Sequence, residues 1–218
     1  MLPYIQKLKY TSLFHHMSLE DIDSVLTCLS AQRRYYKKAE PVFYSGDILS
    51  NIGIVLSGSL HIMKEDYWGN SALIARIGQG EVFGEVFASL NAPIGFDIKA
   101  AQDSEVLFVG LNKILTVCPS SCHFHQRLLK NLITLLAEKN LELTKKTDIL
   151  SQRSIRSKLL EYLSLQKQFH GSNCFDIPFN RQQLADYISV DRSSMTVELS
   201  KMQKEGILRF YKNHFELL

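Results

Sequence analysis

Hydrophobic and polar positions change their pattern along the chain. Between about residues 33 and 110, short apolar runs are separated by glycines, and Leu60 and Ile62 alternate with other residues at period two, as do Val42 and Tyr44. Such alternation is typical of half-buried strands, and short strands with frequent turn signals are typical of a small barrel or jelly roll. The pattern therefore predicts an N-terminal β-roll.

Two local signals mark elements in and before this region. The segment 18–26 begins with Ser18 and has an acidic residue three positions later, which is the spacing of a capping box at a helix start. The segment 65–71 contains Gly69 and Asn70, residue types that adopt the positive φ angles of a tight hairpin turn. The sequence thus predicts a helix before the roll and a hairpin within it.

A heptad pattern starts after Pro119 and continues to about residue 150. Its seam positions recur at alternating spacings of four and three residues, which is typical of a helix that packs against a second helix. Two of these positions, Asn140 and Thr147, are polar, and such residues can fix the register of a symmetric seam at some cost in stability. We expect this helix to form a homodimer, and a core helix packed on the β-roll is the alternative. The seam positions are Leu129, Ile133, Leu136, Asn140, Leu143, Thr147 and Leu150.

Two short helices joined by a tight turn are predicted over residues 180–208. Ala185 is small where the two helices approach each other, and Ser189 stands at the left-handed turn position that glycine usually occupies, at a cost of about 1 kcal/mol. An amphipathic helix over 151–172 precedes the pair, and two apolar runs over 207–218 predict a β-hairpin after it. This arrangement is typical of a winged helix-turn-helix.

The second helix of this pair is expected to begin near Arg192 and to lie in the major groove of DNA. Arginine can bind guanine O6 and N7 together, hydroxyl groups can bond in either direction, and a valine or threonine methyl can touch a thymine methyl. The predicted base-reading residues are Arg192, Ser193, Thr196 and Val197, with Lys201 a turn further on. Ser194 and Arg181 are predicted to contact phosphates, which position a protein without reading sequence. A helical hairpin with a purely structural role is the alternative.

Composition narrows the class of protein. The 218 residues are 45% apolar, which is enough for two domains, and the net charge of +3 lies entirely in residues 151–218, where 10 basic and 7 acidic residues occur. Neither a bilayer-spanning apolar run nor a signal peptide is recognisable, so we expect a cytoplasmic protein that does not bind membranes. Scattered cysteines fit a reducing compartment. The four are Cys28, Cys118, Cys122 and Cys174.

The segments "YYKKAEPVFYSGD", "IVLSGSLHI", "GQGEVFGEV" and "NRQQLADYISVDRSSMTVELSKMQKEGIL" occur in an order and spacing that resemble the CRP/FNR superfamily of bacterial transcription regulators. The resemblance implies an α+β chain. Residues 1–117 would form an effector-sensing β-roll (a double-stranded β-helix or jelly roll) with a leading helix, 118–150 a dimerisation helix and hinge, and 151–218 a winged helix-turn-helix. It also implies a homodimer on a near-palindromic operator, with RNA polymerase as a partner.

The recognition helix departs from the family pattern at two positions. Family members often carry an arginine, a glutamate and a second arginine near the helix start, whereas here Ser193 replaces the glutamate and Val197 replaces the second arginine. The operator is therefore expected to differ from the best-known consensus sequences.

The segment 80–100 corresponds, by the same resemblance, to the place where cyclic-nucleotide-binding members hold the sugar and phosphate. Gly84 and Glu85 match their glycine–glutamate pair, but Ile94 and Gly95 stand where an arginine and a hydroxyl residue would meet the phosphate. A buried phosphate without its guanidinium costs several kcal/mol, so we expect cyclic AMP not to bind unless Lys99 substitutes. A neutral or aromatic effector, or none, is expected instead. The predicted pocket contains Phe83, Gly84, Glu85, Val86, Ile94, Gly95 and Asn140.

A metal or redox sensor is the alternative function. Cys118 and Cys122 are four residues apart with His125 beyond them, and such residues can share zinc or iron, although ordinary core cysteines have the same spacing. The haem-attachment motif and an N-terminal cysteine cluster for an iron–sulfur centre are not recognisable. Nor is there a nucleophile–base pair, a phosphate-binding loop or a dinucleotide fingerprint, so we do not expect an enzyme.

Overall fold

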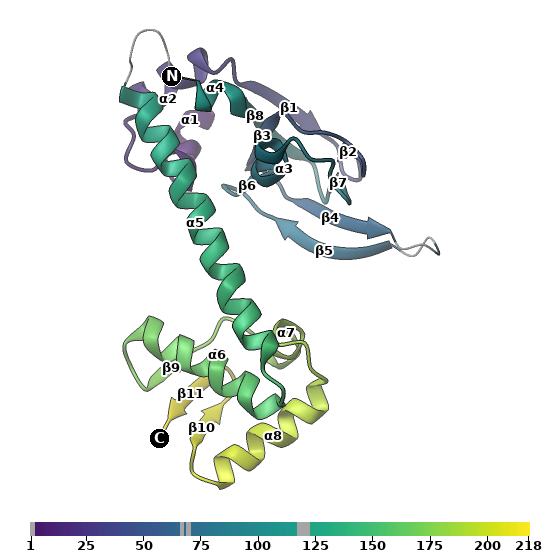
Figure 1. Cartoon of the computed structure of the whole chain (residues 1–218), viewed down its shortest axis with the longest axis vertical. Helices are drawn as coiled ribbons and strands as arrows, with labels where there is room; N and C mark the ends of the chain where they lie inside the picture. Colours follow the sequence, from purple (N-terminus) through teal and green to yellow (C-terminus); the bar gives the residue numbers. More distant parts are fainter. Residues whose placement is uncertain (1–2, 66–67, 69–70, 117–122) are drawn as a thin grey trace. The chain divides into compact units, whose positions relative to one another are not determined.

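The computed structural model describes residues 3–65, 68, 71–116 and 123–218. It has two compact units, Met1–Leu136 and Ala137–Leu218, and the long helix α5 (His123–Ser151) contributes residues to both (Figure 1). The first unit is built mainly from β-sheets and the second mainly from helices, which confirms the predicted α+β class. The division between the units falls inside α5, because Leu128 belongs to the first core and Ile149 to the second.

Two four-stranded antiparallel sheets form the first unit. Their strand orders are β1-β8-β3-β6 and β2-β7-β4-β5. The strands are β1 (Gln32–Tyr36), β2 (Pro41–Phe43), β3 (Asn51–Ser57), β4 (Leu60–Glu65), β5 (Ser71–Ile77), β6 (Val82–Phe83), β7 (Asp97–Ala100) and β8 (Ser104–Gly110). The helices are α1 (Pro3–Leu8), the 3-10 turn η1 (Ser12–Phe14), α2 (Leu19–Cys28), α3 (Glu85–Leu90) and α4 (Leu111–Leu115). The arrangement is the expected β-roll.

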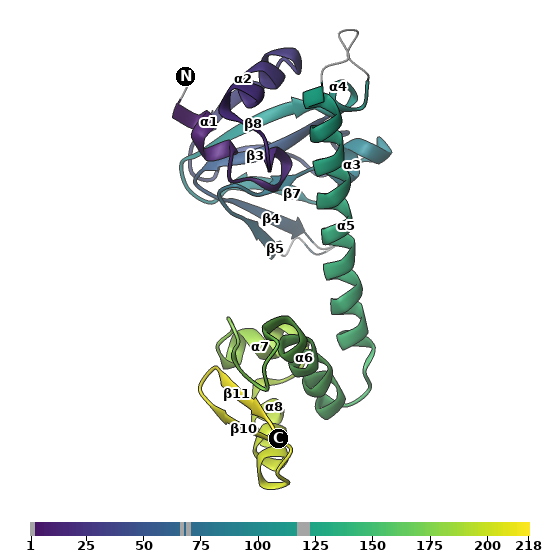
Figure 2. The same ribbon diagram turned by 90° about the vertical axis from the view of Figure 1, so that its left-hand side faces the viewer.

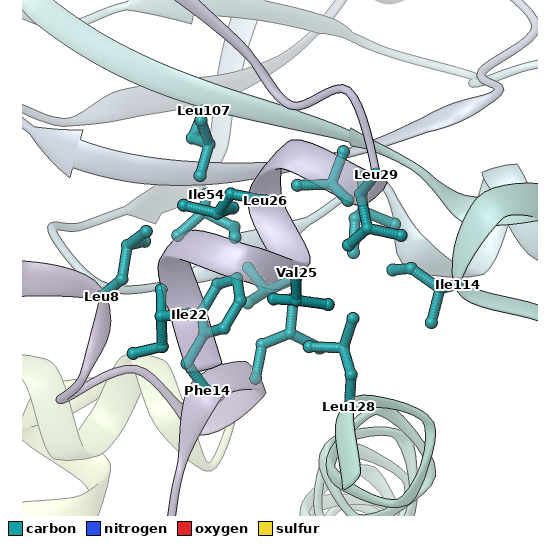
Figure 3. Packing of buried hydrophobic residues seen from close by; sticks show 14 of the residues in the cluster. Leu8, Phe14, Ile22, Val25, Leu26, Leu29, Ile54, Leu107, Ile114 and Leu128 are labelled. Carbon is teal, nitrogen blue, oxygen red and sulfur yellow. The ribbon is translucent and has the colours of Figure 1, made fainter. Parts of the chain in front are cut away.

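The first sheet is covered on both faces. Ile54 of β3 and Leu107 of β8 point toward the helices, where Leu128 of α5 faces Val25 of α2 (Figure 3). The neighbouring positions of both strands point to the second sheet, as the two-residue period of a strand requires. Strands β3 and β8 are therefore buried on both sides rather than half-buried.

An aromatic cluster fills the space between the two sheets. The ring of Phe108 lies edge-on to those of Tyr36, Phe43 and Phe83, with centroids 6.5, 5.8 and 6.3 Å away, respectively. A Cβ at Gly53 would lie 2.2 Å from the Phe83 ring, so only glycine admits that ring against β3. The interior of the roll is thus packed with large apolar side chains at this point.

Local sequence signals are largely confirmed in the first unit. Ser18 and the side chain of Asp21 form the complete capping box of α2. β4 and β5 pair as a hairpin, but its predicted turn residues Gly69 and Asn70 lie outside the described residues. The prediction for Tyr44 is wrong. β2 ends at the preceding residue, and the Tyr44 amide donates to Asp47 in the following turn.

The second unit packs three helices against a small sheet (Figure 2). Its helices are α6 (Ile155–His170), α7 (Arg181–Tyr187) and α8 (Arg192–Lys204). The antiparallel strands β9 (Cys174–Asp176), β10 (Leu208–Tyr211) and β11 (His214–Leu217) lie in the order β10-β11-β9. This is a winged helix-turn-helix, and the predicted hairpin at the end of the chain is its wing.

Candidate nucleic-acid interface and effector region

The helix-turn-helix is fixed locally by two caps and one left-handed residue. Asn180 and Gln183 form a reciprocal capping box at the start of α7, with both hydrogen bonds 2.9 Å long. Ser189 has φ +53° in the turn, as the sequence predicted. Asp191 caps α8, and its carboxylate accepts from the Ser194 amide at 2.8 Å. The predicted start of α8 at Arg192 is confirmed, and the helix ends at Lys204.

A buried apolar cluster sets the crossing of α7 and α8. Ala185 and Ile188 on one side and Met195 and Leu199 on the other have no solvent exposure. Ala185 has only a methyl group at this site, which lets the two helices approach closely. The packing therefore presents the opposite face of α8 to solvent.

Two basic residues near the start of α6 bind the helix-turn-helix. Lys158 Nζ donates to the carbonyl oxygen of Ile188 at 3.1 Å, at the end of α7. Arg156 donates from Nε to Glu198 at 2.8 Å and from its terminal nitrogen to Glu205 at 2.6 Å. It therefore binds both the middle of α8 and the residue just beyond its end. Sequence reasoning missed both basic residues, because their partners are 30 to 49 residues away in the chain.

All the residues predicted to read bases are exposed on one helix. Arg192, Ser193, Thr196, Val197 and Lys201 lie along α8, with Arg192 at its first position. Small and hydroxyl side chains beside a single arginine leave this surface narrow enough to enter a major groove. The structure thus brings the predicted reading residues together, and their individual base contacts stay predictions.

The serine hydroxyl groups at the start of α8 donate hydrogen bonds within the protein. Ser193 Oγ and Ser194 Oγ donate to the same carboxylate oxygen of Asp191, at 2.5 and 3.0 Å. The bond from Ser193, followed by those from Ser194, holds the pKa of Asp191 at about 2. Because the amide of Ser194 also donates to Asp191, neither proton of Ser194 is available to a phosphate in this arrangement. An aspartate directly before a helix start is the sequence signal that would have found this residue.

The side chain of Arg181 packs against the wing. Its guanidinium carbon sits 4.8 Å from the ring centroid of Phe210 and 5.0 Å from that of Phe215, both on the wing. Its terminal nitrogens are buried and have no hydrogen-bond partner within the described part of the chain, and burial lowers the pKa of Arg181. A groove beside it is also lined by Arg192 and Lys212. A phosphate contact by Arg181 stays a prediction.

The predicted seam of α5 is mostly uncovered. Ile133 and Leu143 are 59% and 66% exposed, and Asn140 and Thr147 are exposed as well. Leu129 and Leu136 are partly buried, and Leu150 is at the margin of exposure. A different stripe of α5 packs against the first unit, and it contains Leu128, Leu132 and Leu135. The helix therefore packs on the β-roll, as the alternative interpretation expected, and Leu136 of the predicted seam packs against the same core. Ile133, Asn140, Leu143 and Thr147 of the seam remain exposed.

The residues of the predicted effector pocket come from several elements. Gly84, with φ +80°, joins β6 to α3 and is followed by Glu85, which is buried, while Phe83 belongs to the aromatic cluster. Val86 and Gly95 are exposed. Asn140 belongs to the second unit. The assignment of these residues to a pocket stays a prediction.

The position expected to meet a phosphate is apolar and enclosed. Ile94 is 2% exposed, and its backbone bonds to Gly46 and Asp47 tie it into the roll. Nζ of Lys99, the residue considered as a substitute for the missing arginine, lies 3.0 Å from an oxygen of Asp97. Hydrogen bonds from the Ser45 amide and from Lys99 hold the pKa of Asp97 below its ordinary value. Lys99 is thus neutralised by a carboxylate.

The cysteine–histidine candidate is only partly described. Cys118 and Cys122 lie outside the described residues, whereas His125 is buried near the start of α5. Its Nε2 atom lies 3.9 Å from the sulfur of Cys28 on α2. Within the described part of the chain, no three cysteine, histidine or acidic residues are grouped as metal ligands.

Two families match the chain on either side of α5. The cyclic nucleotide-binding domain family matches residues 33–121, and the Crp-like helix-turn-helix domain family matches residues 157–218. None of the described helices is both long and apolar enough to cross a bilayer.

Relatives of known type align over most of the chain. The Cyclic AMP receptor protein of Thermus thermophilus is 28% identical over 93% of this chain and 90% of its own. Transcriptional activator protein FnrL of Cereibacter sphaeroides is 20% identical over 80% of this chain and 71% of its own. The crystal structure of the Thermus thermophilus Catabolite Activator Protein has a TM-score of 0.56 at 26% identity, covering 95% of this chain and 94% of that one.

Proposed function

Because this chain is a member of the CRP/FNR superfamily of DNA-binding transcription regulators, we propose that it binds a near-palindromic operator as a homodimer. The observation that carries the proposal is the exposed face of α8, where Arg192 stands at the first helical position above a fully buried α7–α8 interface. Two such helices, one from each copy, would enter major grooves one helical turn, or about 34 Å, apart. This role places the protein in the cytoplasm.

The exposed stripe of α5 supports the homodimer. Ile133 and Leu143 are large apolar side chains left in solvent, and they share the seam with Asn140 and Thr147. Burying the stripe against its copy removes apolar surface from water, while the polar positions favour one register. RNA polymerase is the further partner that family membership suggests.

The effector is proposed to be neutral or aromatic, or absent. The relative from Thermus thermophilus is named for cyclic AMP, yet Ile94 here is buried and apolar where a phosphate would need a cation. Lys99 is paired with Asp97. An effector bound in the roll would bias the α5 pair between two arrangements and so change the spacing of the reading helices.

Selection of bound duplexes from a random pool tests the proposal. The purified, effector-free protein is used at physiological salt, and Arg192→Ala is selected in parallel. A palindrome with half-sites one turn apart is expected, and Arg192→Ala should lose about 1–3 kcal/mol of specific binding and relax one base pair per half-site. Binding without sequence preference that vanishes as salt rises would contradict the proposal, since that is phosphate attraction alone.

A second candidate function is redox or metal sensing at the start of α5. The observation that favours it is the 3.9 Å approach of His125 Nε2 to the Cys28 sulfur, because it joins α2 to the helix that would carry a signal. Operator affinity is measured under a thiol reductant and after peroxide, together with zinc and iron content. A Cys118→Ser, Cys122→Ser double variant and Cys28→Ser are compared. Equal affinities and metal-free protein would exclude this function.

A further inference from the structure

One carboxylate oxygen organises the start of the recognition helix. Asp191 Oδ1 accepts three hydrogen bonds, from Ser193 Oγ at 2.5 Å, from the Ser194 amide at 2.8 Å and from Ser194 Oγ at 3.0 Å. Capping the helix requires only the bond from the amide. The two hydroxyl bonds are additional, and they fix where both hydroxyl protons point.

A third hydroxyl on the same face is fixed in a similar way. Thr196 Oγ1 donates to the carbonyl oxygen of Arg192 at 2.8 Å. A hydroxyl group has one proton to donate and two lone pairs that accept. Both hydroxyl protons are used in hydrogen bonds within the protein. Ser193 and Thr196 can therefore only accept hydrogen bonds from a facing molecule.

The base edges in the major groove divide into two classes under this constraint. Adenine N6 and cytosine N4 carry amino groups that donate, whereas guanine and thymine offer only acceptor atoms there. A hydroxyl free to rotate bonds to either class. A hydroxyl that can only accept leaves a guanine or thymine atom unpaired, and an unpaired buried acceptor is costly.

We propose that Asp191 is a specificity-determining positioning residue, which holds the Ser193 proton and so restricts the facing base to adenine or cytosine. The inference rests on the proposed function, since it requires α8 to read bases. Asp191 itself does not need to touch DNA. It acts through Ser193, and its carboxylate remains charged at every pH at which DNA binding is measured, because its pKa is about 2.

Three variants separate this role from helix capping. Asp191→Asn keeps an acceptor oxygen at the same place. Asp191→Gly removes the acceptor, while glycine remains a tolerated residue at the start of a helix. Ser193→Ala removes the reading hydroxyl and leaves the cap intact. Asp186→Asn is the control for lost negative charge, because Asp186 is exposed and lies on α7.

The experiment uses the full-length protein and measures relative affinities for operators that differ at one base. The position facing Ser193 is the one whose preference changes in Ser193→Ala. Wild type, Asp191→Asn and Asp186→Asn should favour adenine or cytosine there by about 2- to 10-fold, and Asp191→Gly should accept all four bases within about 2-fold. Loss of charge alone shifts affinity for every operator equally, so it leaves these ratios unchanged.

Two results overturn the inference and can be told apart. If wild type selects a palindrome but Asp191→Gly keeps the wild-type ratios at every position, or the position facing Ser193 favours guanine or thymine, Asp191 has no such role and the proposed function stands. If wild type selects no sequence at all, both the inference and the proposed function are wrong. If Asp191→Gly does not fold, Ser193→Ala still tests the inference. The base preference that this variant loses must be for adenine or cytosine, and a lost preference for guanine or thymine would overturn the inference.

Discussion

Arg156 Nε donates to Glu198 at 2.8 Å, and this ion pair ties the first turn of α6 to the middle of the recognition helix. The same guanidinium reaches Glu205 just beyond the end of α8. Helix α6 follows α5 after a short connection, so Arg156 lies on the route from the proposed dimer helix to the reading surface. This ion pair couples the orientation of α8 directly to the position of α6, independently of the turn between α7 and α8.

Replacing Arg156 with methionine should loosen α8. Glu198, whose side chain is only 20% exposed, would lose its partner, and an unpaired, partly desolvated carboxylate is unfavourable. Faster amide hydrogen exchange in α8 and a lower unfolding temperature are expected. Arg153→Met serves as the control, because Arg153 is exposed. Equal exchange in the two variants would show that the apolar core alone holds the helix.

Enlarging Ala185 should separate the two helices of the reading head. Ala185 has no exposed surface at the α7–α8 crossing, so leucine there must displace its neighbours. We expect Ala185→Leu to reduce the free energy of unfolding by about 1–3 kcal/mol and to weaken operator binding. Urea titration measures the former. Gln203→Leu, at an exposed position of α8, should stay within about 0.5 kcal/mol of wild type, and a similar loss there would refute the packing argument.

Charge in the α5 stripe should dissociate the proposed dimer. Leu143 is 66% exposed in the single chain, so Leu143→Asp has little effect on the fold but places two carboxylates in an apolar seam. The dimer dissociation constant is expected to rise at least about 100-fold, measured by sedimentation equilibrium against the chain mass of 24.9 kDa. Lys145→Asp, an exposed position outside the predicted seam, should remain dimeric. A dimeric Leu143→Asp protein would place the interface elsewhere.

Cyclic AMP should not change operator affinity. The phosphate would meet buried Ile94, and Lys99 is already paired with Asp97. We expect the operator dissociation constant to stay within about 2-fold of its ligand-free value at millimolar cyclic AMP, because an unpaired phosphate opposes binding by several kcal/mol. Fluorescence anisotropy with labelled operator measures this. A tenfold or greater tightening would show that another residue supplies the missing cation.

Acid should selectively remove the contribution of Asp191 to stability. Its folded-state pKa of about 2 lies below the value of about 3.9 in an unfolded chain, so its stabilising effect is complete above pH 5 and is lost as pH falls toward 2. The difference in unfolding temperature between wild type and Asp191→Asn should therefore be largest above pH 5 and shrink on acidification. A difference independent of pH would mean that the carboxylate charge plays no part.

Features that depend on neighbours a few residues away follow from the amino-acid sequence alone. Ser18 and Asn180 begin helices because a side-chain oxygen and the amide three residues later are always within reach. The left-handed Ser189 and the start of α8 at Arg192 follow from the same short range. The family motifs likewise lie in continuous segments, which is why the fold class could be predicted.

Which distant groups meet depends on how the elements pack in three dimensions. Periodicity shows that α5 has an apolar stripe, but not that Leu128, Leu132 and Leu135 use a neighbouring stripe against the roll. The stacking of Arg181 on the wing and the approach of His125 to Cys28 join residues tens of positions apart. Such contacts are fixed when separate elements pack around a shared core, and no local pattern encodes that packing.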